Sequence, residues 1–461
     1  MRARGQLLSA VLVVALVVAG GVYLQDGIGP RSFAAPPLPE APSGAWFCPH
    51  GGGTDWEVTI EVANPGPTPV RVRVTRLGSG KPSSPDVLTV APDTELQLPA
   101  PAGERGSSTM VEYFGGWVAA GWVAHAGGGE GGVAAEPCLS GGGRRWLVPD
   151  GTAEENQDDY VVVMNPFAAE AVFTLTLYTT RRPAPITPGD WTNVVLRPHR
   201  SEAFRLNPKA LGESTVSTLI DVKVGRVATS SLGVSGLGGI RSSVGIEGPP
   251  PTTSILPGGF DQGATDLVVM DPTEEAASVQ ALLLSKDTSQ AVPSLVESST
   301  NPGSAATYPV TTEGPSALVV RSPAGVAVAR RSLGVTSDQG STSGTGTPGQ
   351  AWVILPAVAG PPTHPGLVLA NPGTEPVEVT LSYLPAAEGP VPSPVTVQVP
   401  AGRVLGPPRS FLEAKPFSAI LAVAPGGTFV PAAASYSLGR EGYATYAVSL
   451  GVPIPEAWIP R

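Results

Sequence analysis

One short pattern occurs four times along the chain, and it constrains the fold more than any other feature. Its clearest copy is LVLANPGTEPVEVTLSY at 367–383, where an apolar run ends at Asn371 and a new alternating run starts at Val377. Proline disfavours the helical region for the residue before it, so Asn371 must end an extended segment. Pro372 and Gly373 then fit a type II turn, with a positive φ at the glycine. The period-two alternation that follows predicts a half-buried strand.

The other three copies keep the same order of elements. They are IEVANPGPTPVRVRV at 60–74, VVVMNPFAAEAVFTLTL at 161–177 and LVVMDPTEEAASVQALLL at 267–284. Each turn is preceded by an apolar motif that ends in proline, which in three copies begins with tryptophan. A Ser-Leu-Gly tripeptide follows the turn in three of the copies, and the copies lie roughly 100 residues apart. Landmarks that keep one order and one period indicate a tandem repeat.

The repeat predicts four domains, each made of short apolar runs separated by turn signals. This texture is typical of an immunoglobulin-like β-sandwich of ~100 residues, whereas a propeller blade needs only ~40–50 residues. We therefore expect an all-β chain, in which an N-terminal membrane anchor helix is followed by four tandem immunoglobulin-like β-sandwich repeats. The expected boundaries are 1–25 for the signal anchor, 26–43 for a Pro/Ala/Gly-rich tether, and 44–143, 144–250, 251–349 and 350–461 for the repeats, of which the third is the most divergent.

The N-terminus carries the localisation signal. Arg2 and Arg4 precede an uncharged apolar run at 7–24, which is just long enough to span a bilayer as a helix. The two arginines should stay in the cytoplasm and send the rest of the chain outside. No Ala-x-Ala cleavage site follows at once, so we expect an uncleaved single-pass anchor in the cell membrane; secretion after cleavage is the alternative. The net charge of −10 argues against a nucleic-acid partner.

The chain has two cysteines, Cys48 and Cys138. In an exported protein such a pair favours one disulfide. This disulfide would join the start of the first repeat to its end. By closing a loop it would lower the entropy of the unfolded chain, which stabilises the fold by about 4 kcal/mol. Two separate buried thiols are the alternative.

The search for chemistry gives no catalytic, cofactor-binding or metal-binding constellation. No Gly-x-Ser-x-Gly or His-Glu-x-x-His motif is present, and the four histidines fall at unrelated positions of the repeats. The acidic segment at 154–159 could offer oxygen ligands to Ca²⁺, but it lacks the residue order of an EF-hand loop. We interpret it as a solvated loop, and we expect no cofactor and no enzymatic activity.

The order of these landmarks after one anchor resembles an actinobacterial family of secreted or membrane-tethered proteins that is known only as a domain of unknown function. The resemblance covers residues 45–461 and rests on Trp-x-x-Pro, Asn-Pro-Gly, the Val-x-Val-x-Leu strand and Ser-Leu-Gly. It implies no activity, cofactor or catalytic residue. The third repeat departs from the pattern at Ser254 and Asp271.

We expect a non-catalytic protein that is tethered to the membrane and contacts another envelope protein or a glycan, with its repeats arrayed in tandem away from the membrane. The alternative is a secreted carbohydrate-active enzyme or its accessory binding subunit. The contact surfaces expected are the hairpin tips after each Ser-Leu-Gly and the aromatic strand of the first repeat. If Val118 points inward as Val227 should, Trp117 points outward and could anchor a partner; otherwise the neighbouring repeat covers it.

Overall fold

The computed structural model describes residues 42–182, 184–258, 264–296, 298–333, 339–357, 364–386, 390–415, 418–438 and 444–460. The chain divides into two units, Met1–Ala41 and Pro42–Arg461. The expected anchor at 1–25 and nearly all of the expected tether at 26–43 lie outside the described residues. Within the described ranges, no helix has both the length and the hydropathy that a membrane crossing requires.

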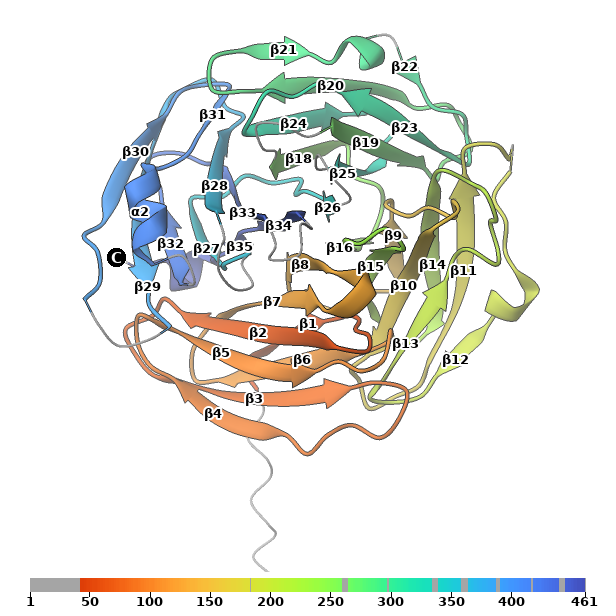
Figure 1. Ribbon diagram of the computed structural model, residues 1–461, viewed down its shortest axis with the longest axis horizontal. Helices are drawn as coiled ribbons and strands as arrows, with labels where there is room; N and C mark the ends of the chain where they lie inside the picture. The colour runs from red at the N-terminus through yellow and green to blue at the C-terminus, as the bar shows by residue number, and fades with distance from the viewer. Residues whose placement is uncertain are drawn as a thin grey trace, which may run out of the picture. The chain divides into compact units, whose positions relative to one another are not determined.

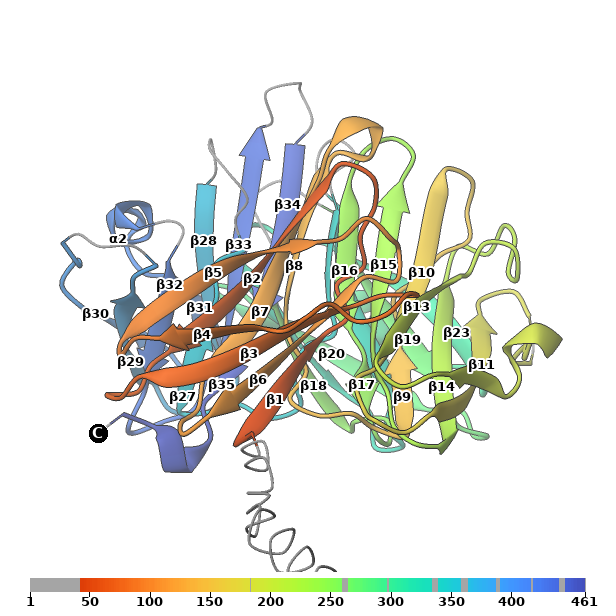
Figure 2. The same cartoon turned by 90° about the horizontal axis from the view of Figure 1, so that it is seen from below.

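The second unit is all-β, as expected, and its strands form eight sheets in which neighbouring strands run antiparallel (Figures 1 and 2). Along the chain the sheets come in four successive couples, which we name sheet pairs 1 to 4. A short helix, α2 (Arg409–Ala414), belongs to pair 4.

The elements have the following bounds. Pair 1 contains β1 (Gly44–Cys48), β2 (Trp56–Asn64), β3 (Val70–Leu77), β4 (Asp86–Val90), β5 (Thr94–Pro101), β6 (Ser108–Phe114), β7 (Ala119–Ala126), η1 (Gly128–Glu130) and β8 (Gly132–Pro137). Pair 2 contains β9 (Arg145–Val148), β10 (Gln157–Asn165), β11 (Ala171–Thr179), η2 (Gly189–Trp191), β12 (Val194–Leu196), β13 (Arg200–Arg205), β14 (Val216–Val224), β15 (Ala228–Ser235), β16 (Ile240–Val244) and β17 (Ile246–Glu247). Pair 3 contains β18 (Thr253–Gly258), β19 (Ala264–Asp271), β20 (Ser278–Leu284), β21 (Ser289–Ala291), η3 (Pro293–Leu295), β22 (Ser298–Ser299), β23 (Ser304–Val310), β24 (Ser316–Arg321), β25 (Ala327–Leu333) and β26 (Gln339–Thr342). Pair 4 contains β27 (Ala351–Ile354), β28 (His364–Asn371), β29 (Val377–Leu384), β30 (Val395–Val399), β31 (Arg403–Leu405), α2, β32 (Ala419–Val423), β33 (Val430–Leu438), β34 (Ala444–Leu450), β35 (Val452–Pro453) and η4 (Glu456–Trp458).

The chain follows an equivalent path in every pair. In pair 1 the strand orders are β1-β6-β3-β4 and β5-β2-β7-β8, and in pair 4 they are β35-β27-β32-β29-β30 and β31-β28-β33-β34. Pairs 2 and 3 have the corresponding orders, in which the strand that ends in the turn residue lies second in its sheet. The recurring sequence pattern therefore corresponds to a recurring strand arrangement.

The turn residue at the end of this strand is buried and holds three segments together. In pair 4 the amide nitrogen of Asn371 donates to the carbonyl oxygens of Glu375, Val399 and Pro400, at 2.8, 3.1 and 3.2 Å. Its oxygen accepts the backbone N–H of Gly373 at 2.9 Å. The side chain thus forms the turn itself, and neither Gly373 nor its counterpart Gly66 adopts a positive φ. The expected type II turn is therefore wrong, because the asparagine oxygen replaces the hydrogen bond that would define it.

Asn64 and Asn165 make the same set of bonds, each donating to three carbonyl oxygens and accepting one N–H. Asp271 cannot donate in this way. Its carboxylate instead accepts from the backbone N–H groups of Thr273 and Ala277 and from the hydroxyl of Thr300. The groups that bond the buried side chain are therefore hydrogen-bond donors in pair 3, whereas most of them are acceptors in the other three pairs.

We predict that Asn165→Asp destabilises the chain by about 2–4 kcal/mol, because a buried carboxylate would lose three donated bonds and face the three carbonyl oxygens. Urea denaturation of the full chain measures the change. Asn301→Asp, at an exposed position, is the matched control and should be nearly neutral. Equal effects of the two substitutions would contradict the role of the buried amide.

The predicted disulfide between Cys48 and Cys138 is confirmed, with a Cα–Cα distance of 4.5 Å. Cys48 ends β1, which lies in one sheet of pair 1, and Cys138 follows β8, which lies in the other. The bond therefore joins the two sheets at one end of the pair. Both cysteines are buried, so the bond is part of the core.

The expectation that Trp117 is exposed is wrong. Val118 and Val227 are both fully buried, as the repeat alignment required, and their carbonyl oxygens accept the indole N–H groups of Trp46 and Trp146. Trp117 is nevertheless only 6% exposed. It lies just before β7, where regular strand alternation does not apply, and its ring packs edge-on against Trp46 at 6.2 Å. Part of its cover therefore comes from pair 1 itself.

Four strands from different pairs pack against one another in a closed circle. β8 contacts β16, β16 contacts β26, β26 contacts β34, and β34 contacts β8 (Figure 1). Glycine permits the close approach at two of these contacts, since a Cβ on Gly132 would lie 2.6 Å from the nitrogen of Ile240, and one on Gly340 would lie 2.4 Å from the Tyr446 ring. Pair 1 therefore contacts pair 4 as well as pair 2, so the four pairs form one ring of contacts.

The contact between pairs 1 and 4 is mainly apolar, and we name it the closing seam. One hydrophobic cluster continues from pair 1 into pair 4, where it includes Val353, Leu355 and Val452. Leu355 fills the space beside Gly121, where a Cβ would lie only 2.5 Å from its side chain. Small and branched residues therefore close the circle.

Two carboxyl groups of pair 1 are buried at the closing seam. Glu61, directly opposite Gly121 in the sheet, is 3% exposed, and Glu95 is 4% exposed. Glu95 accepts the backbone N–H of Ala419 from pair 4 at 2.7 Å. Burial raises the pKa of Glu95 to about 7, against the effect of its hydrogen bonds. Burial and then the charge of Glu95 raise the pKa of Glu61 well above its usual value.

We predict that Glu61→Gln stabilises the chain at pH 8 and has little effect at pH 5. Because its pKa is raised, folded Glu61 holds a proton that the unfolded state releases, so stability falls as the pH rises above the usual range of a glutamate. The neutral amide avoids this loss. Denaturation at the two pH values measures the difference, with the exposed Glu378→Gln as control. An equal loss of stability at both pH values would contradict the prediction.

Candidate functional site

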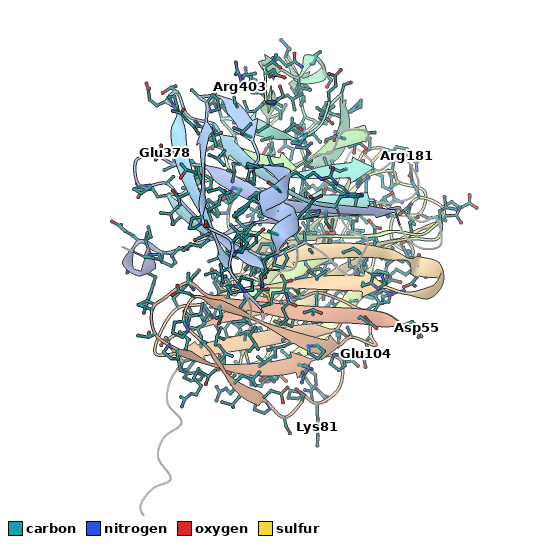
Figure 3. The ribbon with its side chains drawn as sticks, turned by 60° about the vertical axis from the view of Figure 1, so that its left-hand side comes forward. Asp55, Lys81, Glu104, Arg181, Glu378 and Arg403 are labelled. Carbon is teal, nitrogen blue, oxygen red and sulfur yellow. A yellow bond between two sulfur atoms is a disulfide. The ribbon has the colours of Figure 1, made fainter. Side chains whose placement is uncertain are left out.

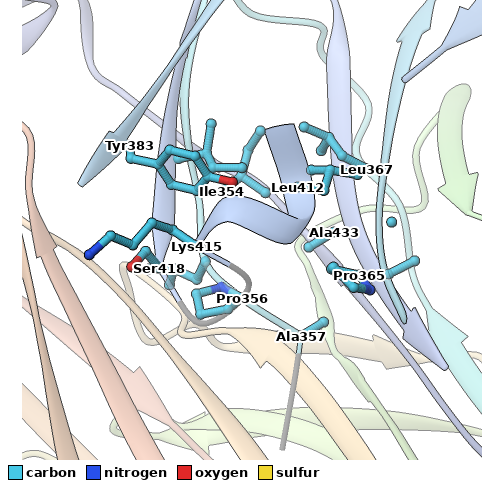
Figure 4. A pocket seen from close by; sticks show the side chains of 14 residues that line it. Ile354, Pro356, Ala357, Pro365, Leu367, Tyr383, Leu412, Lys415, Ser418 and Ala433 are labelled. Atoms are coloured by element: carbon cyan, nitrogen blue, oxygen red, sulfur yellow. The ribbon is translucent and has the colours of Figure 1, made fainter. Parts of the chain in front are cut away.

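One small pocket lies in pair 4 beside α2, and it is too small for a ligand (Figure 4). Its volume is about 30 Å³, and Ile354, Leu367 and Leu412 contribute to its largely apolar wall. The Tyr383 hydroxyl that reaches this region donates to the carbonyl oxygen of Phe411. Burial raises the pKa of Tyr383 to about 12, so the phenol stays protonated. The pocket is a packing defect with room for water.

A cluster of buried charges lies where pairs 2 and 3 meet, and it is the most unusual polar feature of the described residues. Asp150 follows the proline of the Trp-x-x-Pro motif after β9, and Asp159 lies on β10. Arg241 lies on β16, and Arg331 crosses from β25 of pair 3. All four side chains are at most 10% exposed.

The four charges form one connected network. Arg331 donates through Nε to Asp150 Oδ1 at 2.8 Å, and Arg241 donates through Nε to Asp150 Oδ2 at 3.0 Å. Arg241 also donates to Asp159 and, through Nη1, to Gln339 Oε1 at 2.7 Å. Each arginine therefore has a carboxylate partner, as buried guanidinium groups require.

The pKa values of the two aspartates in the network are shifted in opposite directions. Burial would raise the pKa of Asp150, but Arg331 and Arg241 hold it well below the usual range. Burial raises the pKa of Asp159 to about 6, and the nearby charge of Asp150 adds to this while Arg241 opposes it. One oxygen of Asp159, Oδ1, has no hydrogen-bond partner.

This arrangement explains the glycine of one Ser-Leu-Gly motif. A Cβ on Gly233 would lie 2.5 Å from Nη1 of Arg241 and 2.9 Å from Oδ1 of Asp159. The glycine leaves room for the charged pair. The counterparts Gly334 and Gly439 lie outside the described residues.

A cavity of about 390 Å³ opens beside the network, and we name it the polar cavity. Residues from pairs 2 and 3 both contribute to its wall, which carries hydroxyl, amide, carboxylate and guanidinium groups. The lining residues are Thr152, Glu154, Gln157, Ser214, Thr215, Arg241, Asp266, Thr307, Arg331 and Gln339. No aromatic or aliphatic residue is among them, so a ligand here would be recognised through hydrogen bonds.

The acidic segment expected to be a solvated loop behaves differently at its two ends. Glu154 and Glu155 are exposed, and Asp158 pairs with Arg205 at the surface. Asp159, however, is 2% exposed and belongs to the buried network. The expectation is therefore wrong at this residue, because strand alternation in β10 turns its side chain inward. Among the described residues no group of three acidic, histidine or cysteine side chains could hold a metal ion.

Other residues singled out in the sequence lie elsewhere. The hairpin tip of pair 2 is exposed at Leu237, whereas the corresponding tips at 334–338 and 439–443 lie outside the described residues. His50 is buried in pair 1, and its ring lies 2.6 Å from the carbonyl oxygen of Gly51 and 3.0 Å from the Thr109 hydroxyl. Burial lowers its pKa to about 4, so it stays neutral.

The outer surface carries ordinary exposed charges. Lys81, Glu104 and Asp55 extend outward at the edge of pair 1 (Figure 3). Arg73, in the basic strand of this pair, forms two hydrogen bonds with Glu112 of the neighbouring strand, both at 2.6 Å. This surface therefore presents paired charges instead of a positive field.

The polar cavity could hardly be predicted from the sequence. Arg241 and Arg331 were missed because an isolated arginine in a short strand reads as a surface residue. One signal was available: the residue after the motif proline is His50 in the first copy and Asp150 in the second, and both are buried polar residues. Their partners, however, come from distant parts of the chain.

We predict that Asp150→Asn destabilises the chain by about 3–5 kcal/mol at pH 7, since it leaves two buried guanidinium groups short of a carboxylate. Asp159→Asn should stay within about 1 kcal/mol of the native chain, because the fold already disfavours ionised Asp159 above pH 6.

The dependence of stability on pH distinguishes the role of Asp150 from that of Asp159. The stability due to Asp150, whose pKa is lowered, is present above about pH 4 and is lost only in strong acid. The cost of ionising Asp159 grows from about pH 4 to about 6, so Asp159→Asn should flatten stability in that window. Denaturation curves between pH 4 and 8 measure both effects, and equal losses for the two variants at pH 7 would contradict the assignment.

Comparisons with known proteins add a family but no activity. The profile described as "Family of unknown function (DUF5719)" matches residues 112–405. No curated protein matches the chain. Among solved structures, a tetra-tandem repeat in the extending region of a large adhesion protein is 12% identical, and the match covers 85% of this chain and 93% of that chain at a TM-score of 0.09. So low a TM-score supports neither a shared fold nor a shared function.

Proposed function

Because the chain belongs to the family of unknown function DUF5719, no activity can be carried over from relatives, and we propose a function from its own residues. We propose that it is a non-catalytic, membrane-tethered protein outside the cytoplasm that contacts a protein or glycan of the cell envelope. The residues 7–24 would form its anchor, and four immunoglobulin-like repeats at 44–143, 144–250, 251–349 and 350–461 would form its body.

The disulfide is the observation that carries the compartment. Cytosolic reductants keep most thiols reduced, so a buried structural disulfide favours an oxidising location. The bond between Cys48 and Cys138 joins two sheets of pair 1 and is 0–4% exposed at its cysteines. Together with the apolar run at 7–24, it supports export of everything after that run.

The equivalent strand orders of the four sheet pairs support the proposed repeats. Each pair contains two antiparallel sheets, and the turn residue occupies the same place in each. The contact circle of β8, β16, β26 and β34 brings all four into one body. Such a body offers ligands a fixed surface instead of a flexible string of separate modules.

The pairing of the charged side chains at the polar cavity favours binding over catalysis. Arg241 and Arg331 are each satisfied by an aspartate, so they hold the walls in place. A secreted carbohydrate-active enzyme is the second candidate, and the raised pKa of buried Asp159 is the observation that favours it, since general acids need such a shift.

Cell fractionation tests the compartment with the full chain in its own host. We expect the protein in the membrane fraction after an alkaline carbonate wash, accessible to protease added to spheroplasts, with Cys48 and Cys138 oxidised. Recovery in the cytosol with both thiols free would overturn the proposal, and recovery in the culture medium would replace the anchor by a cleaved signal peptide.

Incubation with purified wall polymers tests the absence of catalysis. The full chain in detergent should release no reducing ends above buffer over several hours. If it does, and Asp159→Asn abolishes the release, the enzyme is the correct reading. The chain carrying Glu378→Gln, a substitution at an exposed position in pair 4, serves as the matched control.

A further inference from the structure

We propose that the polar cavity between sheet pairs 2 and 3 binds a neutral saccharide of one or two sugar rings. This inference rests on the proposed function, because it selects a glycan over a protein as the contact. The volume of about 390 Å³ lies within the range of ligand sites, which starts near 300 Å³.

Two amide groups at the cavity are left with unused hydrogen-bonding capacity. Gln339 is 5% exposed, and its Oε1 accepts from Nη1 of Arg241 at 2.7 Å. Arginine can only donate, so this bond fixes the orientation of the amide and leaves Nε2 as a donor. That nitrogen has no partner, although it is buried. An unpaired buried donor is unfavourable, and a ligand or water that accepts its hydrogen bond removes this cost.

The second amide supplies the opposite group. Gln157 Oε1 is a buried acceptor without a partner, and its nitrogen lies 3.4 Å from the Ser235 hydroxyl. Gln339 belongs to pair 3 and Gln157 to pair 2, so the two pairs each contribute one unpaired amide group to residues that line the cavity, a donor and an acceptor. A sugar hydroxyl both donates and accepts, which suits such a mixed wall.

The charges at the wall disfavour ionic ligands. Arg241 uses its Nε and both Nη atoms on Asp150, Asp159 and Gln339. Arg331 uses its Nε and Nη2 on Asp150 and Gly151, so neither arginine offers a free guanidinium fork to an anion. The carboxylates of Asp266 and Glu154 also line the cavity and would repel an anion. A cation would meet the two arginines. A neutral ligand avoids both repulsions.

The other lining residues favour a saccharide over a peptide as the ligand. Peptide recognition uses a free strand edge and pockets for apolar side chains. The lining residues offer no apolar pocket, whereas their hydroxyls, at Thr152, Ser214, Thr215 and Thr307, suit a hydroxylated ligand. The Thr215 and Thr307 hydroxyls form a hydrogen bond of 2.7 Å with each other, which joins the two pairs beside the cavity.

Titration of the full chain in detergent with maltose, cellobiose, trehalose and N,N′-diacetylchitobiose tests the inference, with saturation-transfer NMR as the readout. We expect at least one of these to bind with a dissociation constant on the order of 1 mM, a weak value because no aromatic ring is present for stacking. Gln339→Met and Gln157→Leu should each weaken binding at least tenfold. Gln398→Leu, an exposed glutamine on β30, should not.

The outcomes are distinct. Binding that survives both amide substitutions, or binding of capped tetraglycine in place of every sugar, overturns the inference, as does a failure of all four saccharides to bind. Thermal unfolding shows whether Gln339→Met folds, and Gln157→Leu keeps the test decisive if it does not. A chain that fractionates outside the cytoplasm yet binds no sugar would refute the saccharide while leaving the proposed function in place.

Discussion

A single buried amide joins segments that the chain separates by as many as 32 residues. In pairs 1, 2 and 4 the side chain of one asparagine ends a strand, forms the turn after it and donates to carbonyl groups before and within the next hairpin. Its two N–H groups are shared among three carbonyl oxygens, and its oxygen accepts one further bond, so the buried amide is satisfied without water. The two sheets of a pair are connected through this hairpin, so their separation and register depend on the amide.

Pair 3 indicates which part of this interaction is essential. Asp271 reverses the donor and acceptor roles, and Thr300 supplies the hydroxyl that the carboxylate then needs. The geometry of the buried side chain has been kept while its chemistry has changed. A buried polar group is thus replaceable only together with its partners, which is why asparagine and aspartate are not equivalent at this position.

The sequence was sufficient for features that depend on neighbouring residues. Strand ends at Asn64 and Asn371 follow from proline sterics. The disulfide is an exception among distant contacts, because a chain with two cysteines allows only one pairing. Features that join distant residues were not predictable in this way. Arg331 meets Asp150 across 181 residues, and no local pattern reports such a contact. Trp117 was misjudged for a related reason, because strand alternation cannot describe a residue outside the strand.

The contact between β8 and β34 has a consequence for biosynthesis. Pair 4, which covers pair 1 at the closing seam, is synthesised after the other three pairs. The apolar surface of pair 1 therefore stays uncovered until pair 4 has left the ribosome. β8 ends at Pro137 and β34 ends at Leu450, so about 310 residues are added between them, which takes roughly 15–60 s at about 5–20 residues per second. During synthesis, the N-terminal portion therefore has an uncovered apolar side until the strands of pair 4 have been made.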